Sequence, residues 1–146
     1  MDRNGALALT VAASALVAMQ APINSHLGKA IGTFQASFVS FAIGTAVLAV
    51  VVAVSGGYGD IGKATTLPWY YLMGGVLGVV YVTTLLVAVR TLGAAGILAG
   101  TLVGQMAASV VIDRYGLLGV QQAAITATRL AGIALVAAGA WLVTRG

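Results

Sequence analysis

Long apolar stretches separated by short charged or glycine-rich segments make up nearly the whole chain. Four stretches carry no charged residue, and a fifth is interrupted once, by Arg129. A bilayer core of about 30 Å requires about 20 apolar residues per helix. The pattern therefore predicts an all-α, polytopic membrane protein, folded as a single five-helix transmembrane domain over residues 1–146. The five helices are expected at roughly 5–23, 34–55, 68–89, 95–112 and 124–144.

The segments between these stretches have the composition of membrane-surface turns. We expect a short turn over Ser25–Gly32, a glycine-rich loop over 56–67, a tight turn over 90–94 and a charged connection over 113–119. Pro68 fits the first turn of the third helix, where a missing amide donor does no harm. Trp69, Tyr70 and Tyr71 follow it, and such aromatic residues are typical of the membrane–water interface.

The first apolar stretch has a second interpretation as a cleaved signal peptide. Asp2 and Arg3 precede it, and Ala13-Ser14-Ala15 has the pattern of a cleavage site. The apolar stretch continues well past that point, so we expect it to stay as the first helix. Cleavage would leave four spans.

The composition agrees with a chain that has lipid as its solvent. Hydrophobic residues make up 60% of the chain and charged residues 7%, against about a quarter charged in soluble proteins. The chain has no Cys, one His, and three acidic residues that are all Asp. We therefore expect no cofactor, no metal and no enzymatic activity. The basic residues are scattered singly, so nucleic acid is not an expected partner.

The distribution of positive charge gives only a weak preference for one orientation. With five spans, one side of the membrane holds four basic residues (Arg3, Lys63, Arg114, Arg129) and the other holds three (Lys29, Arg90, Arg145). One interpretation is insertion in both orientations, so that two copies form an antiparallel homodimer with the symmetry of inverted-repeat transporters. The alternative is a single orientation set by the first helix. We favour dual insertion.

Small residues recur at helical spacing and predict close helix packing. Gly96, Gly100 and Gly104 form a row at intervals of four in the fourth predicted helix. Small residues let helix backbones approach closely in lipid, where van der Waals contact drives association. Shorter rows occur in the second helix (Ala36, Ser40, Gly44) and in the third (Gly74, Gly78).

A polar row runs beside the glycine row on the fourth helix. Thr101, Gln105, Ser109 and Asp113 lie at intervals of four, about 100° around the helix from the glycines. Facing lipid, these groups would lose water contacts without compensation. The row is expected to face a cavity or another helix. Thr101 and Ser109 fit bonding to their own backbone, whereas Gln105 fits a substrate ligand and an interhelical contact equally well.

The end of the first predicted helix carries a second polar group. Gln20 and Asn24 are four residues apart on one face, and Pro22 lies between them and frees the carbonyl of Ala18. Transporters use such interruptions to bind solutes. In the alternative, Pro22 simply ends the helix at the interface and the amides are solvated caps. The sequence supports both interpretations equally.

Three charged residues are expected on the same side of the membrane: Asp113 and Arg114 at the end of the fourth predicted helix, and Arg129 in the fifth. Arg129 lies about a turn and a half into the fifth predicted helix, and a charge at mid-bilayer costs roughly 2.5–3.5 kcal/mol. Asp113 is its nearest candidate partner, and we favour a structural ion pair. The alternative is a gate or coupling site, in which Asp113 is the one plausible proton carrier.

Together these motifs resemble the YdcZ-type proteins, a five-helix bacterial inner-membrane branch of the drug/metabolite transporter superfamily. The resemblance is carried by residues 20–24 and 27–29, Ala36-Ser37, Ser40-Phe41, Gly44, Gly74-Gly75, Gly78, Gly104-Gln105, Ser109, Asp113, Gly116, Arg129 and Gly132. It implies a multi-pass inner-membrane transporter, assembled as an antiparallel pair. Small multidrug exporters of this superfamily use a Glu in their first helix, and this chain has Gln20 there and no Glu.

The leading hypothesis is a secondary transporter of a small polar solute, with its pathway at an antiparallel dimer interface. Gln20, Asn24, Gln105 and Ser109 would bind the substrate, and Asp113 and Arg129 would gate or couple. One alternative is a small-multidrug-type exporter of cationic or guanidinium compounds, which needs Asp113 as its acidic coupling group. A second is a non-transporting membrane subunit that stabilises a partner. The substrate, direction and coupling ion lie beyond the sequence.

Overall fold

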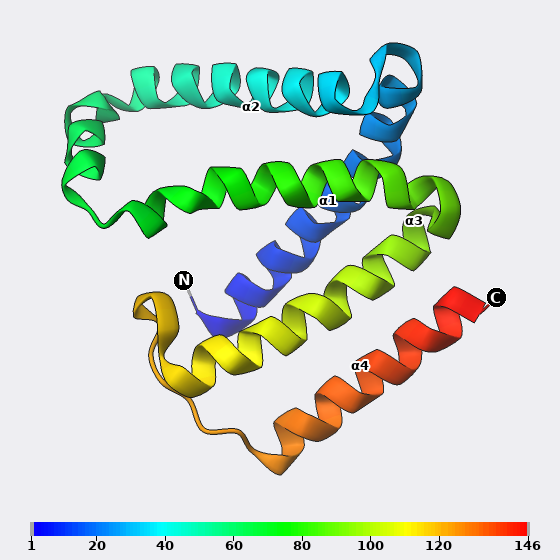
Figure 1. Cartoon of the computed structure of the whole chain (residues 1–146). Coiled ribbons are helices and arrows are strands. Elements are labelled where there is room, and N and C mark those ends of the chain that lie inside the picture. The colour runs from blue at the N-terminus through cyan, green and yellow to red at the C-terminus, as the bar shows by residue number, and fades with distance from the viewer. Residues whose placement is uncertain (1, 146) are drawn as a thin grey trace. The chain divides into compact units, whose positions relative to one another are not determined.

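The computed structural model describes residues 2–145, and helices are the main elements of that part of the chain (Figure 1). The elements in order are α1 (Arg3–Ile31), α2 (Thr33–Ser55), the 3-10 helices η1 (Gly57–Thr66) and η2 (Trp69–Met73), α3 (Gly74–Tyr115), the 3-10 turn η3 (Leu117–Gly119) and α4 (Ala127–Arg145). Four of these helical stretches, in the residues described, are long and apolar enough to cross a membrane. The all-α, multi-pass prediction is therefore confirmed.

One of the four membrane-spanning stretches consists of two helical segments. Residues Trp69–Tyr115 form a 47-residue stretch, and at 1.5 Å per residue it would measure about 70 Å, over twice a bilayer core. Gly93 breaks the helix, with φ 67° and ψ 174°. Residues with a Cβ rarely adopt that backbone conformation, whereas glycine does so at little cost. The break falls within the predicted 90–94 turn and gives the five predicted helices.

Helix α1 is longer than the sequence suggested, and the predicted turn over Ser25–Gly32 is wrong. The helix continues through Pro22 to Ile31 and ends at Gly32, whose φ is 101° and whose N–H donates to the Gly28 carbonyl at 3.0 Å. The physical reason lies on its buried face, where Asn24, Ser25 and Gly28 pack against neighbouring helices. This packing compensates for the hydrogen bond that Pro22 removes.

Two further helix boundaries differ from the prediction. Pro68 does not lie in the first turn of the third helix, because the 3-10 helix η2 separates it from α3. Helix α4 begins at Ala127 rather than at residue 124, since the Thr126 hydroxyl accepts the N–H of Arg129 at 3.2 Å as an N-terminal cap. Arg129 therefore stands in the first turn of α4 rather than a turn and a half inside it.

The chain divides into two compact units, residues 1–90 and 91–146. The first holds α1, α2 and the part of α3 up to Arg90. Within it, α2 and this part of α3 run side by side in opposite directions (Figure 1), joined by a hydrogen bond between Ser37 and Thr83. Leu86 and Ala36 are fully buried at the junction of the three helices.

The second unit holds the rest of α3 together with α4, which run in opposite directions (Figure 1). Ile97 is its buried apolar residue among those described. A shallow apolar groove of about 440 Å³ lies between the two helices, lined by Ala95, Leu98, Ala99, Leu102, Val136, Gly139, Ala140 and Val143. The single-domain organisation over 1–146 stays a prediction.

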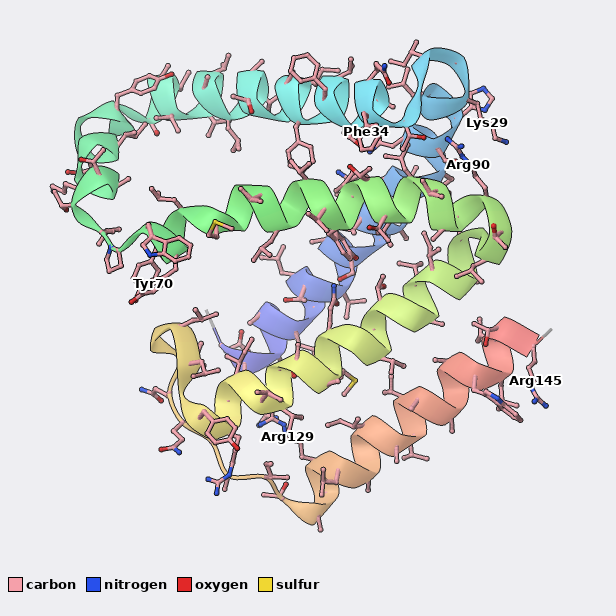
Figure 2. The ribbon with its side chains drawn as sticks, viewed as in Figure 1. Lys29, Phe34, Tyr70, Arg90, Arg129 and Arg145 are labelled. Carbon is pink, nitrogen blue, oxygen red and sulfur yellow. The ribbon has the colours of Figure 1, made fainter. Side chains whose placement is uncertain are left out.

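Large apolar side chains cover the outside of the helices. Phe38 is 74% exposed and Val54 is 84% exposed on α2, which in water would favour aggregation. In lipid the same surface is the expected one, since the solvent is itself apolar. Tyr70 lies in η2, at the end of the first unit away from Lys29 and Arg90 (Figure 2), consistent with the predicted aromatic anchor.

Candidate functional site

The candidate site begins on the buried face of α1, which is made of small and polar residues. Its buried members are Ala21, Asn24, Ser25 and Gly28. Their spacing of three, one and three residues places them on one helix face. Small residues are typical of a packed face in a membrane helix, and buried amide and hydroxyl groups there need hydrogen-bond partners.

Those partners lie on α2 and on the first segment of α3. The Asn24 Nδ2 donates to the Ser40 hydroxyl at 3.1 Å. Ser37, which is only 4% exposed, lies 2.9 Å from the Thr83 hydroxyl, oxygen to oxygen. Two hydrogen bonds between side chains therefore tie α2 to its two neighbours inside the apolar bundle.

The guanidinium group of Arg90 lies in the same junction, at the end where α1 connects to α2. The Arg90 Nε donates to the Ser25 hydroxyl, and its Nη2 donates to the Thr33 hydroxyl, each at 3.4 Å. Arg90 lies near the α1–α2 connection, at the same end of the unit as Lys29 (Figure 2). The three helix ends that meet here are thus joined through one positive charge.

The opposite end of the junction opens into a groove. A groove of about 260 Å³ is lined by Gln20, Ser40, Phe41, Gly44, Thr45 and Leu48. A second, more open one of about 340 Å³ is lined by Gln20, Asn24, Leu16, Val17 and Ile23. Both hollows share Gln20, whose side chain is exposed in the single chain.

These polar groups lie at intervals along α2, in a junction where the fully buried Leu86 and Ala36 pack beside Gly28, and together we call them the polar track. We use that name for Gln20, Asn24, Ser37, Ser40, Thr45, Thr83 and Arg90 with its two hydroxyl partners. From Thr33 to Thr45 the track covers thirteen residues of α2, and its first and last residues are about 18 Å apart along the axis at 1.5 Å per residue. That length is more than half of the hydrocarbon thickness. The uncharged amide and hydroxyl groups that line the groove, Gln20, Ser40 and Thr45, can hold a solute through neutral hydrogen bonds.

The structure brings together two of the four predicted substrate-binding residues. Gln20 and Asn24 line the same groove in the first unit. Gln105 and Ser109 belong to the second unit. Ser109 donates to the Met106 carbonyl of its own helix at 2.9 Å, and Gln105 is exposed. The role of all four as substrate ligands stays a prediction.

The expected ion pair between Asp113 and Arg129 is present. Their side chains are 25% and 29% exposed, and the Arg129 Nη2 contacts the Asp113 Oδ2. Asp113 lies at the C-terminal end of α3 and Arg129 at the N-terminal end of α4, where each charge alone would oppose the helix dipole. Pairing offsets both repulsions. A gating or coupling role for the pair stays a prediction.

The three glycines predicted to pack helices have different surroundings. Gly96 is buried, and a Cβ built there would lie 3.9 Å from the Thr144 methyl group on α4. Gly100 and Gly104 have open space where a side chain would be. Their predicted packing role therefore stays untested in a single chain.

The sequence analysis missed Ser37, Thr83 and Arg90 as site residues, and assigned Ser40 to helix packing alone. A signal was available in the spacing. Thr83 and Arg90 are seven residues apart, two turns along one face, and Thr33 lies four and seven residues before Ser37 and Ser40. Hydroxyl residues in an apolar helix are easily discounted, because they can bond their own backbone.

The comparison with known proteins gives one match. Residues 5–142 match the family model DMT_YdcZ, described as "Putative inner membrane exporter, YdcZ". No curated protein and no solved structure matches the chain. The match covers nearly the whole sequence, and the long apolar helices agree with a multi-pass protein of the inner membrane. The chain therefore belongs to the YdcZ family of the inner membrane.

Proposed function

We propose that this protein is a secondary transporter that exports a small polar solute along the polar track. The observation that carries the proposal is the groove lined by Gln20, Ser40 and Thr45, in which Ser40 accepts a hydrogen bond from the buried Asn24. Amide and hydroxyl groups at hydrocarbon depth are costly unless they meet protein, water or a solute. The family description as an exporter supports the same activity.

A second, inverted copy would complete the pathway. Gln20 is exposed in the single chain, and an amide facing lipid would lose its water hydrogen bonds. The near balance of basic residues on the two sides supports insertion in both orientations. In this proposal Gln105 and Ser109 complete the binding site, and the small-residue row with Gly100 and Gly104 packs against the second copy.

The pairing of Asp113 weighs against export of cations coupled to that carboxylate. A coupling acid must exchange a proton for its cargo, whereas the Asp113 carboxylate is held by the Arg129 guanidinium. Transport that keeps its pH dependence in an Asp113→Asn variant would remove the cation-export alternative. A non-transporting subunit is the remaining alternative, and it would move no solute in liposomes.

The test is a flux screen with purified protein. Liposomes containing the full chain would be screened by solid-supported membrane electrophysiology against a panel of small polar metabolites. We expect at least one solute to give a current in protein-containing liposomes only. Gln20→Leu and Ser40→Ala should each lower that current about tenfold or more, because Gln20→Leu removes the proposed hydrogen bond to the solute and Ser40→Ala removes the acceptor of Asn24.

The matched control is Val47→Leu, on an exposed apolar position of α2, which should leave the current unchanged. Equal currents from Gln20→Leu, Ser40→Ala and the wild-type protein would refute the polar track as the pathway. The absence of any current across the whole panel would favour the subunit alternative.

A further inference from the structure

From the environment of Arg90 we infer that this residue forms an oxyanion-binding site at one end of the polar track, beside the connection between α1 and α2. The ligand class is a carboxylate or a phosphate group. The inference extends the proposed function, because it assigns a negative group to the transported solute when that solute is the ligand.

Arg90 has no acidic side chain left to pair with in this sequence. The chain has three acidic side chains, and each is engaged elsewhere. Asp2 accepts the N–H of Gly5 as the cap of α1, Asp60 pairs with Lys63, and Asp113 pairs with Arg129. No side-chain carboxylate of this protein is left to neutralise Arg90. Arg90 is exposed in the single chain, so an external anion can reach this charge.

The guanidinium of Arg90 keeps hydrogen-bond donors free for a ligand. Arginine has five N–H donors, and Arg90 uses two of them on the hydroxyls of Ser25 and Thr33. Three donors therefore stay available. The two hydroxyl contacts fix the plane of the group, which is what a forked contact to a carboxylate or phosphate requires.

Gly28 leaves room for the guanidinium beside α1. A Cβ at Gly28 would lie 3.1 Å from the Arg90 Nη2 and 2.8 Å from the Leu86 Cδ2. The absence of a side chain at this position lets the guanidinium lie against α1. The contact with α1 and the two hydroxyl partners, each at 3.4 Å, favour one position of the exposed guanidinium.

The surroundings add positive potential and no competing anion. Helix α2 starts at Thr33, and its N-terminus has no side-chain cap and no acidic residue in its first turn. Its first N–H groups therefore favour a negative group nearby. Lys29 lies in the last turn of α1, at the same end of the unit (Figure 2). The site itself consists of Arg90 with Ser25 and Thr33, and the α2 N-terminus and Lys29 add positive potential around it.

The experiment measures anion-dependent stability of the full-length protein in an uncharged maltoside detergent. Sodium acetate and sodium phosphate are compared with sodium chloride at equal ionic strength, and unfolding is followed by tryptophan fluorescence. A ligand that binds only the folded state raises the unfolding temperature. We expect a rise of about 2–4 °C for the wild-type protein near saturation.

The variants separate the site from a general effect of charge. Arg90→Gln should lose the rise, and Arg90→Lys should keep only part of it, because an ammonium group cannot reproduce the fork. Arg145→Gln removes the same charge and should keep the full rise. Should Arg90→Gln fail to fold, Gly28→Ala displaces the guanidinium without removing it and should also reduce the rise.

Nanodiscs of phosphatidylcholine, with or without phosphatidylglycerol, identify the source of the anion. A lipid ligand predicts that phosphatidylglycerol stabilises the wild-type protein but not Arg90→Gln, and that added acetate or phosphate then has no effect. A solute ligand predicts the same acetate or phosphate response in both kinds of nanodisc.

Two results would overturn the site: an undiminished response in Arg90→Gln, or no response of the wild-type protein to either anion or to phosphatidylglycerol. Failure of the transport proposal is a separate outcome. A protein that binds the anion through Arg90 but gives no current keeps the site and loses the transport activity.

Discussion

At the scale of single residues, the site depends on positions that have almost no side chain. Gly28 lets Leu86 and the Arg90 guanidinium approach α1, and Ala36 is fully buried beside them. Because a lipid environment supplies no hydrophobic force between helices, such close contacts provide much of the packing energy. The same contacts hold Asn24 and Ser37 at hydrogen-bonding distance from their partners.

We predict that Gly28→Ala destabilises the protein by about 1–3 kcal/mol, as expected for a methyl group added to a packed core. The new Cβ would lie 2.8 Å from the Leu86 Cδ2, so α1 and α3 must separate. Thermal unfolding in detergent measures the effect. The matched control is Gly44→Ala, where nothing lies within 4 Å of the added methyl group. Equal stability of the two variants would contradict the packing described at Gly28.

At the scale of elements, the connection between α3 and α4 is organised by helix ends. The Gln122 Nε2 donates to the Arg114 carbonyl at 2.8 Å, and the N–H of Ala123 donates to the Asp113 carbonyl at 2.8 Å. These bonds satisfy carbonyl groups that the end of α3 leaves free. Thr126 then caps α4, and the ion pair of Asp113 with Arg129 joins the two helices.

We predict a modest coupling energy between Asp113 and Arg129. A double-mutant cycle with Asp113→Asn and Arg129→Gln, read by thermal unfolding, should give about 0.5–1 kcal/mol, because both groups are partly exposed to screening. The control pair is Asp60 with Lys63, whose side chains are 80% and 77% exposed and whose coupling should be smaller. Additive effects at Asp113 and Arg129 would show that the pair contributes nothing to stability.

The sequence predicted the helices better than it predicted their ends. Long uncharged stretches determine how many helices there are, and Gly93 marks the break inside α3 as expected. The end of α1 was missed because Pro22 and the polar residues after it look like a helix terminus. Their tertiary partners on α2 and α3 keep that region helical, and local sequence carries no information about such partners.

The site was predictable only in part for the same reason. Gln20 and Asn24 stand out as amides in an apolar helix, and the structure places them in one groove. Ser40, Thr83 and Arg90 become site residues only when three helices meet. The ion pair of Asp113 with Arg129 was accessible to sequence reasoning, since acidic residues are scarce and Asp113 is the nearest one to Arg129 in the chain.

At the scale of the whole molecule, the proposal requires two copies in opposite orientations. Reporters that are active on only one side of the membrane, fused to the C-terminus, should give signals from both sides. Adding two Lys residues to the glycine-rich loop between α2 and η2 should shift the population toward one orientation. A wild-type signal from one side only would contradict the antiparallel homodimer, although not the polar track itself.

If the polar track meets water inside the membrane, cysteines placed along it should react with a reagent dissolved in water, and the chain suits this test because it contains no Cys. Single cysteines would be placed at Thr45 and Ser40, which line the groove, and at Val47, an exposed apolar position on the same helix. Labelling with a charged, membrane-impermeant thiol reagent in liposomes should modify Thr45→Cys and Ser40→Cys and leave Val47→Cys unmodified. Equal resistance of all three cysteines to the reagent would contradict the account.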